Sequence, residues 1–101
     1  MHRNTLTCKL TTPELQLRKS TLLTELKSAA LERIETQDGV KLKFNGSDAN
    51  IDMLTSFIKT ERLCCDFFEF DLKVKDENEF AWLNLSGPEG AKEFIRTELG
   101  L

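Results

Sequence analysis

The segment FEFDLKVK, residues 68–75, alternates an apolar side chain with a charged one at every position. A period of two residues is typical of a β-strand that has one face on the core and the other in water. A turn over residues 76–79 and a further strand through Phe80 to Leu85 follow it. This part of the chain is therefore expected to form a hairpin.

A second hairpin is expected upstream, over residues 31–44, around an Asp-Gly pair. A two-residue turn would pair Glu35 with Leu42 and so place a charge on the apolar face. A three-residue loop instead pairs Ile34 with Leu42 and gives Gly39 the left-handed position of a bulge. We favour the three-residue loop, because strand register follows the hydrophobic face.

Two helices are expected before and between these hairpins. The first has Thr12 as its cap and Pro13 in the first helical position, and its apolar spacing runs to about residue 29. The second is capped by Ser47 or Asp48 and continues to about residue 65. Both starts carry side-chain oxygens that can accept a hydrogen bond from the first free amides of a helix.

A last helix is expected after residue 85, where Ser86 and Glu89 are spaced for a capping box. Its inner stripe would consist of Ala91, Phe94, Ile95 and Leu99. The predicted order is thus α-β-β-α-β-β-α. It indicates an α+β two-layer sandwich, with an antiparallel four-stranded sheet and helices on one face. We expect one domain over residues 1–101, with residues 1–11 as an extended arm.

Composition excludes several classes of function. The 101 residues carry a net charge of −3, and acidic and basic residues are interleaved, so nucleic acid is not an expected partner. No apolar run is long enough for a membrane span or a secretory signal. We therefore expect a cytoplasmic protein whose three cysteines are reduced thiols.

The unusual chemical feature is an adjacent pair, Cys64-Cys65, at the end of the second helix. Helical spacing puts Cys65 on the apolar stripe and Cys64 near its edge, so Cys64 is the more accessible of the two. Glu61 falls within the same stripe, one turn earlier. A buried carboxylate needs a partner, and we expect Arg62 or Arg33 to supply it.

Three interpretations of this cluster stay open. The thiols pack as small apolar groups, or they bind a soft metal or metalloid ion through Cys64, Cys65 and Cys8, with Glu61 beside them. With His2 as the single histidine, a three-coordinate ion fits better than tetrahedral zinc. Thiol catalysis is disfavoured, because a helix C-terminus and a carboxylate both oppose a thiolate. The leading hypothesis is a non-enzymatic protein that binds a soft ion, with no catalytic residue assigned.

A second candidate surface lies on the predicted strand 80–85. Ala81, Leu83 and Leu85 share its inner face, which leaves Phe80 and Trp82 on the other side of the sheet. Either the first helix or the arm covers these two rings, or they form an interaction face for a second copy or a protein partner. In this alternative the cysteines are purely structural.

Two motifs resemble those of a family of small, uncharacterised bacterial proteins. They are Glu61-Arg62-Leu63-Cys64-Cys65-Asp66-Phe67 and the segment from Leu83 to Phe94, LNLSGPEGAKEF, and Cys8-Lys9-Leu10-Thr11 before the first helix also matches. Asp66 stands where proline is usual in that family. The resemblance implies a bacterial cytoplasmic domain in which all three cysteines occupy family positions, and it implies no particular activity.

Overall fold

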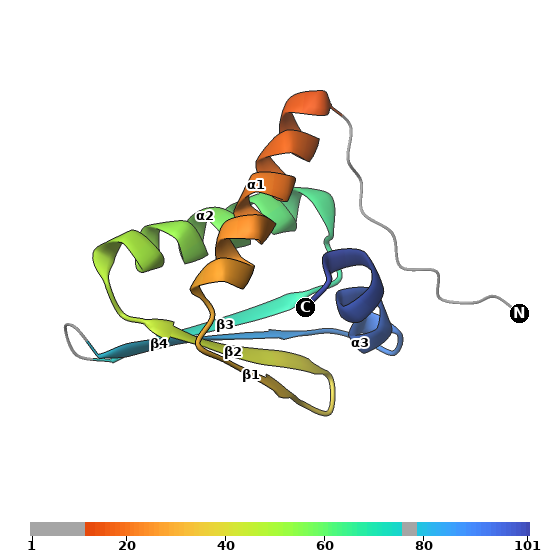
Figure 1. Cartoon of the computed structure of the whole chain (residues 1–101). Coiled ribbons are helices and arrows are strands. Elements are labelled where there is room, and N and C mark those ends of the chain that lie inside the picture. The colour runs from red at the N-terminus through yellow and green to blue at the C-terminus, as the bar shows by residue number, and fades with distance from the viewer. Residues whose placement is uncertain (1–11, 76–78) are drawn as a thin grey trace, which may run out of the picture.

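The computed structural model describes residues 12–75 and 79–101, and Figure 1 shows its arrangement. The elements in chain order are α1 (Pro13–Ala29), β1 (Glu32–Glu35), β2 (Gly39–Asn45), α2 (Asp48–Cys64), β3 (Glu69–Val74), β4 (Phe80–Ser86), α3 (Ala91–Phe94) and the π-helical turn η1 (Ile95–Leu99). This order confirms the predicted α+β fold. The predicted arm, residues 1–11, lies outside the described residues.

The four strands form one antiparallel sheet in the order β1-β2-β4-β3. Helices α1 and α2 lie on one face of the sheet, and α1 crosses over α2 (Figure 1). The short C-terminal helix covers one end of the same face. None of the helices within residues 12–75 and 79–101 lies on the opposite face of the sheet.

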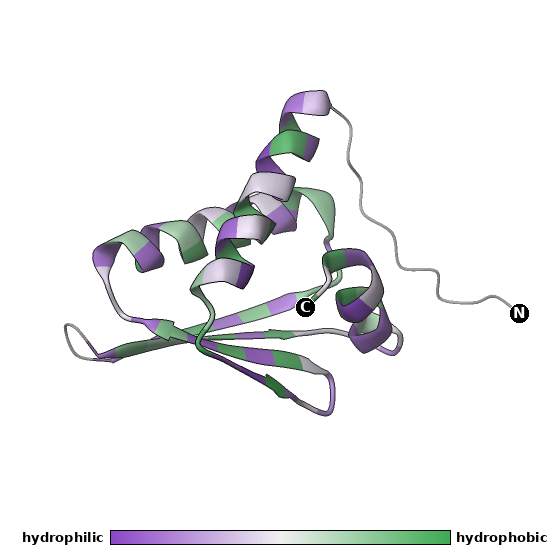
Figure 2. Ribbon diagram, viewed as in Figure 1, coloured by the Kyte–Doolittle hydropathy of each residue, from purple (hydrophilic) through white to green (hydrophobic). Residues whose placement is uncertain are grey.

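The core lies between the sheet and the helices. Its floor is made by alternate residues of the two central strands, Val40, Leu42 and Phe44 from β2 and Ala81, Leu83 and Leu85 from β4. Figure 2 shows the corresponding alternation of hydrophobic and hydrophilic residues along the strands. Each fully buried large apolar side chain stabilises the fold by about 1.5–3 kcal/mol, so these strands anchor the helix layer.

Both predicted starts of the long helices are confirmed. Thr12 caps α1 by accepting a hydrogen bond from the amide of Leu15 at 3.1 Å, and Ser47 caps α2 by accepting one from the amide of Asn50 at 3.2 Å. The helix ends at residues 29 and 64 agree with the predicted bounds to within one residue. None of the helices in the described part of the chain is long and apolar enough to cross a bilayer.

The predicted register of the first hairpin is wrong. Ile34 pairs with Lys41 instead of Leu42, so its side chain lies on the open face of the sheet with 44% exposure. Arg33 takes the position opposite Leu42, and its Nε donates a hydrogen bond to the carbonyl oxygen of Leu101. All four residues of β1 are exposed, and a strand without a buried face specifies its register only weakly.

Gly39 has a different role from the predicted one. The described glycines with positive φ are Gly90 and Gly100, so Gly39 does not occupy a left-handed bulge position. A Cβ at Gly39 would instead lie 1.8 Å from the carbonyl oxygen of Leu85. Glycine is required there because the hairpin passes directly against β4.

The predicted capping box of the last helix is also wrong. Ser86 still belongs to β4, where it pairs with Glu69. The helix begins at Ala91, after Gly90 with φ 97°, and has no side-chain cap. The predicted inner stripe of this segment is nevertheless confirmed, since all four of its residues are buried: Ala91, Phe94, Ile95 and Leu99.

Candidate thiol site

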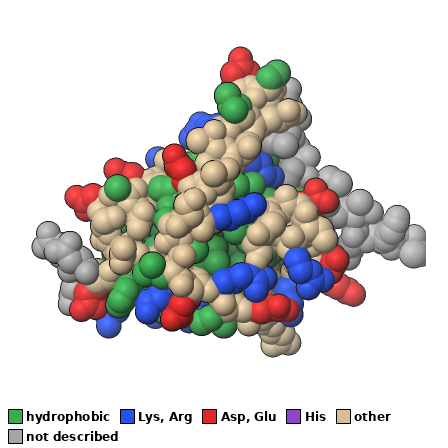
Figure 3. Space-filling model, viewed as in Figure 1, with side chains coloured by type: hydrophobic (Ala, Val, Ile, Leu, Met, Phe, Trp, Pro, Cys, Tyr) green, Lys and Arg blue, Asp and Glu red, His purple; other side chains and the backbone are tan. Residues whose placement is uncertain are grey.

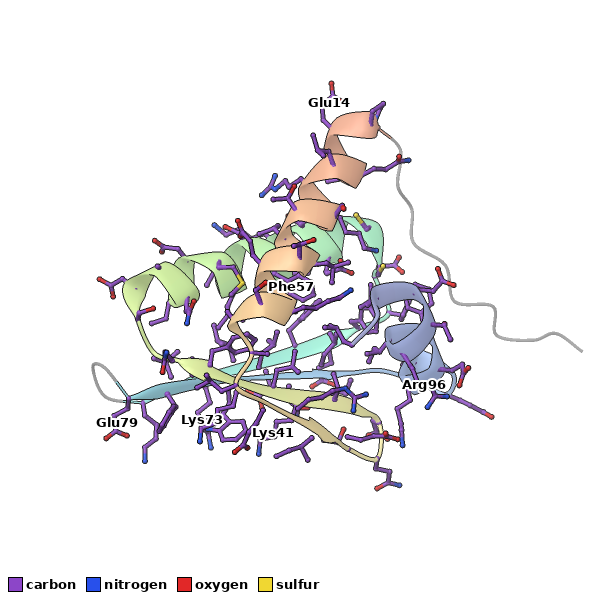
Figure 4. All side chains as sticks on the ribbon, in the orientation of Figure 1. Glu14, Lys41, Phe57, Lys73, Glu79 and Arg96 are labelled. Carbon is purple, nitrogen blue, oxygen red and sulfur yellow. The ribbon has the colours of Figure 1, made fainter. Side chains whose placement is uncertain are left out.

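The candidate site forms where α1 crosses the C-terminal half of α2. The buried residues of α1 are Lys19, Leu22 and Leu26, so a lysine occupies a position of the apolar stripe. On α2 the buried face ends with Thr60, Glu61 and Cys64, and Cys65 is the C-cap residue. The crossing therefore brings a lysine, a carboxylate and two sulfurs into one apolar interface. Figure 4 shows the side chains between these helices, with Phe57 of α2 labelled.

Lys19 is the centre of this group. Its Nζ lies 3.6 Å from Oε2 of Glu61 and 3.7 Å from Sγ of Cys65. Lys19 is 8% exposed, while Glu61 and Cys65 are fully buried. A buried ion pair is costly to desolvate and strongly destabilising to break, so Lys19 and Glu61 hold each other in place.

Burial controls the protonation of the acidic groups. It raises the pKa of Glu61, and the nearby Lys19 ammonium opposes this rise only in part. Burial also raises the pKa of the Cys64 thiol, with Lys19 lowering it and Glu61 raising it further. Within the described residues, no hydrogen-bond donor satisfies either Glu61 oxygen or the Thr60 hydroxyl. These buried oxygens therefore lack the hydrogen bonds that would stabilise a charged carboxylate.

The two cysteines differ in bonding, although they do not differ in burial. Cys65 is disulfide-bonded, whereas Cys64 is a free thiol. Both side chains are 0% exposed, so the expectation that Cys64 is the more accessible is wrong. The expectation of reduced thiols is wrong for Cys65. Apolar packing explains Cys64 well, but it does not account for a lysine placed against Cys65.

Only some of the predicted ion-binding residues lie in the described part of the chain. Cys64, Cys65 and Glu61 do lie together, but Cys8 and His2 fall outside the described residues. Residues 12–75 and 79–101 contain no group of three His, Cys, Asp or Glu side chains able to hold a metal ion. A soft-ion site would therefore need Cys8, and this hypothesis stays a prediction.

Lys19 is the residue that the sequence analysis missed. The expected partners of Glu61 were Arg62 and Arg33, yet Arg62 is exposed and Arg33 binds the carbonyl of Leu101. The signal was present in α1, because Lys19 stands four residues after Leu15 and three before Leu22. That spacing puts its charge on the inner stripe of the helix.

The second candidate surface, Phe80 and Trp82, lies on the open face of the sheet. Phe80 is 38% exposed, and Trp82 is partly exposed. Lys43 Nζ lies 4.0 Å from the Phe80 ring centroid, and Lys41 Nζ lies 4.9 Å from that of Trp82. Figure 4 shows Lys41 and Lys73 pointing away from the helix layer. Helix α1 therefore does not cover these rings.

Comparison with known proteins adds no family to this geometry. No protein-family model, no curated protein and no solved structure matches the sequence. The resemblance to small bacterial proteins stays a prediction. Function must therefore be argued from the site.

Proposed function

We propose that the protein undergoes thiol–disulfide exchange at Cys65, with Lys19 as the cation that stabilises the Cys65 thiolate. The observation that supports this proposal is the 3.7 Å contact between Lys19 Nζ and the disulfide-bonded sulfur of Cys65. A nearby cation favours the thiolate over the thiol. It offsets the helix C-terminus and Glu61, which oppose a thiolate at this position.

The second sulfur of the exchange is Cys8 in this proposal. The chain has three cysteines, and Cys64 is a free thiol. Cys8 is the remaining cysteine that the sequence offers to Cys65. Cys64 stays protonated because burial raises its pKa, and so it does not compete as a nucleophile.

The exchange proceeds in two displacements. The thiolate of an external thiol attacks Cys8, the protein S–S bond breaks, and Cys65 leaves as a thiolate beside Lys19. A second external thiolate then attacks the external sulfur of the mixed disulfide and releases Cys8. One protein disulfide and two external thiols thus give two protein thiols and one external disulfide, with two electrons and two protons passing to the protein.

This proposal fits a cytoplasmic location. Disulfides in that compartment are usually transient, and they serve catalysis or redox sensing. A disulfide whose leaving thiolate is stabilised by a buried lysine is suited to such cycling, since a more stable leaving thiolate departs faster. Lys19 would therefore set how readily the bond opens.

Thiol counting in redox buffers tests the proposal. The unfolded chain should titrate as one free thiol after oxidation and three after reduction, in thiol–disulfide buffers of roughly −320 to −120 mV. Cys8→Ser and Cys65→Ser should each abolish the transition, whereas Cys64→Ser should keep it. A transition that survives Cys65→Ser would refute the assignment.

The role of Lys19 has its own control. Lys19→Met should slow reduction at least roughly tenfold, because a contact to a charged group contributes about 1.5–3 kcal/mol. Lys19→Arg keeps the cation and should restore most of the rate. Equal rates in all three proteins would show that Lys19 only packs.

The soft-ion hypothesis concerns the reduced protein, in which all three sulfurs are available as ligands. Adjacent Cys64 and Cys65, joined by Cys8, would supply three soft ligands, with Glu61 beside them. Competition titrations of the reduced protein with Zn(II), Cu(I), Hg(II) and As(III) should then give an affinity that Cys64→Ser and Cys65→Ser both lower. If both variants bind as tightly as the unsubstituted protein, soft-ion binding is ruled out.

The open sheet face favours a different candidate function, a non-enzymatic module that forms a homodimer. A depression of about 290 Å³ lies over Trp82 and is lined by Lys41, Asp71, Lys73 and Asn84. Lysines flank one aspartate there, so a two-fold contact can set Asp71 of one copy against a lysine of the other. Exposed apolar rings within a polar rim are typical of contact surfaces.

A further inference from the structure

A groove of about 370 Å³ separates α1 from the C-terminal turn η1. Its walls include Lys19, Ser20 and Lys27 from α1, and Thr97, Glu98 and Gly100 from the other side. Figure 3 shows Lys and Arg side chains on this side of the molecule, between α1 and the C-terminal helix. Lys19 lines the groove and its Nζ also contacts Cys65, so the groove and the thiol site share this lysine.

The mouth of the groove carries a second cation. Lys27 is exposed, and its Nζ lies against the backbone of Gly100, where a Cβ would come within 2.7 Å of it. Lys27 makes no ion pair with another residue of the described ranges. Glycine at position 100, with φ 72°, leaves room for the ammonium group. Lys19 is paired with Glu61, so Lys27 is the exposed cation of this groove and Glu98 its carboxylate.

The spacing of the two lysines defines the length of the ligand. Eight residues along an α-helix correspond to about 12 Å between Cα atoms. An extended chain of three residues spans roughly 10 Å. A ligand of tripeptide size can therefore place its sulfur at the Lys19 end of the groove, on the side of the disulfide, while a carboxylate reaches Lys27.

We infer that this groove binds the external thiol of the exchange, and that this thiol is a small peptide of about three residues that carries carboxylates. The inference rests on the proposed exchange at Cys65. Lys27 acts on the bound carboxylate and is a specificity-determining residue, while Ser20 and Thr97 offer hydroxyls to its peptide groups. An uncharged thiol can reduce the same disulfide, but it gains nothing from Lys27.

The test compares two thiols on the oxidised full-length protein, glutathione as the anionic tripeptide and 2-mercaptoethanol as the uncharged thiol. Lys27→Glu should slow reduction by glutathione about fivefold, the size of an exposed ion pair at its upper limit. Reduction by 2-mercaptoethanol should be unchanged. Glu98→Gln should have the opposite effect: it should speed reduction by glutathione and leave reduction by 2-mercaptoethanol unchanged. Lys59→Glu, an exposed lysine on α2 away from the groove, is the matched control.

The outcomes separate the two proposals. The groove inference is supported if Lys27→Glu slows reduction by glutathione alone and Lys59→Glu is reduced at the rate of the unsubstituted protein. If Lys27→Glu changes the rate of reduction by neither thiol, the groove inference is overturned and the proposed exchange at Cys65 stands. If neither thiol reduces the native protein, both proposals are overturned.

Discussion

The two faces of the sheet hold lysines in opposite environments. On the helix-covered side, Lys19 is buried against Glu61 and Cys65. On the open side, Lys41 and Lys43 lie over the rings of Trp82 and Phe80 and stay in contact with water. A lysine exposed on a surface is replaceable at little cost, whereas a buried one must be paired. The difference predicts that substitution of the buried lysine costs more than substitution of the exposed ones.

The largest expected effect comes from breaking the buried pair. Lys19→Met should lower the free energy of unfolding by about 3–5 kcal/mol, because it leaves Glu61 buried without its cation. The double variant Lys19→Met, Glu61→Leu should recover most of this loss, since an apolar pair of similar volume is often no less stable.

Urea unfolding of the single and double variants measures the coupling between the two residues. Lys41→Met on the open face is the matched control, and its effect should stay within about 1 kcal/mol. If the two lysine substitutions cost the same, the contrast between the faces would be wrong.

The next effect compares neighbours within β4. Leu83 is fully buried and Trp82 is partly exposed on the opposite face. Leu83→Ala should therefore lower the free energy of unfolding by about 2–5 kcal/mol through lost burial and a cavity. Thermal unfolding would show a fall in Tm of roughly 10 °C or more for a domain of this size. A smaller loss than at Trp82 would contradict the assignment of the inner face.

The sequence predicted well which side chains of β3 and β4 face the core. Apolar and polar residues alternate along residues 68–75 and 80–85, and only one assignment of the faces then buries the apolar side chains. It failed at β1, whose four residues are all exposed, so no buried face selects the register of this strand. It found the unusual position of Glu61 but missed Lys19. That pairing depends on how α1 crosses α2, which spacing along one helix does not determine.

A more gradual effect concerns pH. Burial raises the pKa of Glu61 in the folded protein, so the folded state holds this proton to a higher pH than the unfolded chain does. The contribution of Glu61 to stability is then fully present below the pKa of the unfolded chain. It is lost as pH rises through the raised value of the folded state.

Glu61→Gln, which stays neutral, should flatten this part of the curve of unfolding free energy against pH. A slope that persists in Glu61→Gln would assign the titration to another group.

The smallest effect on stability is expected at Trp82 itself. Its ring is partly exposed, and Lys41 and Lys43 contact it from the water side, so Trp82→Ala should cost less than Leu83→Ala. Its larger consequence should be on association, because the ring lines the depression together with Lys41 and Lys73.

Sedimentation velocity over a range of concentrations should show self-association of the unsubstituted protein that Trp82→Ala weakens. Asp71→Lys should weaken it too, since it replaces the carboxylate that lines this depression with a cation. A protein that stays monomeric at every concentration would remove the homodimer proposal and leave the open face a solvated surface.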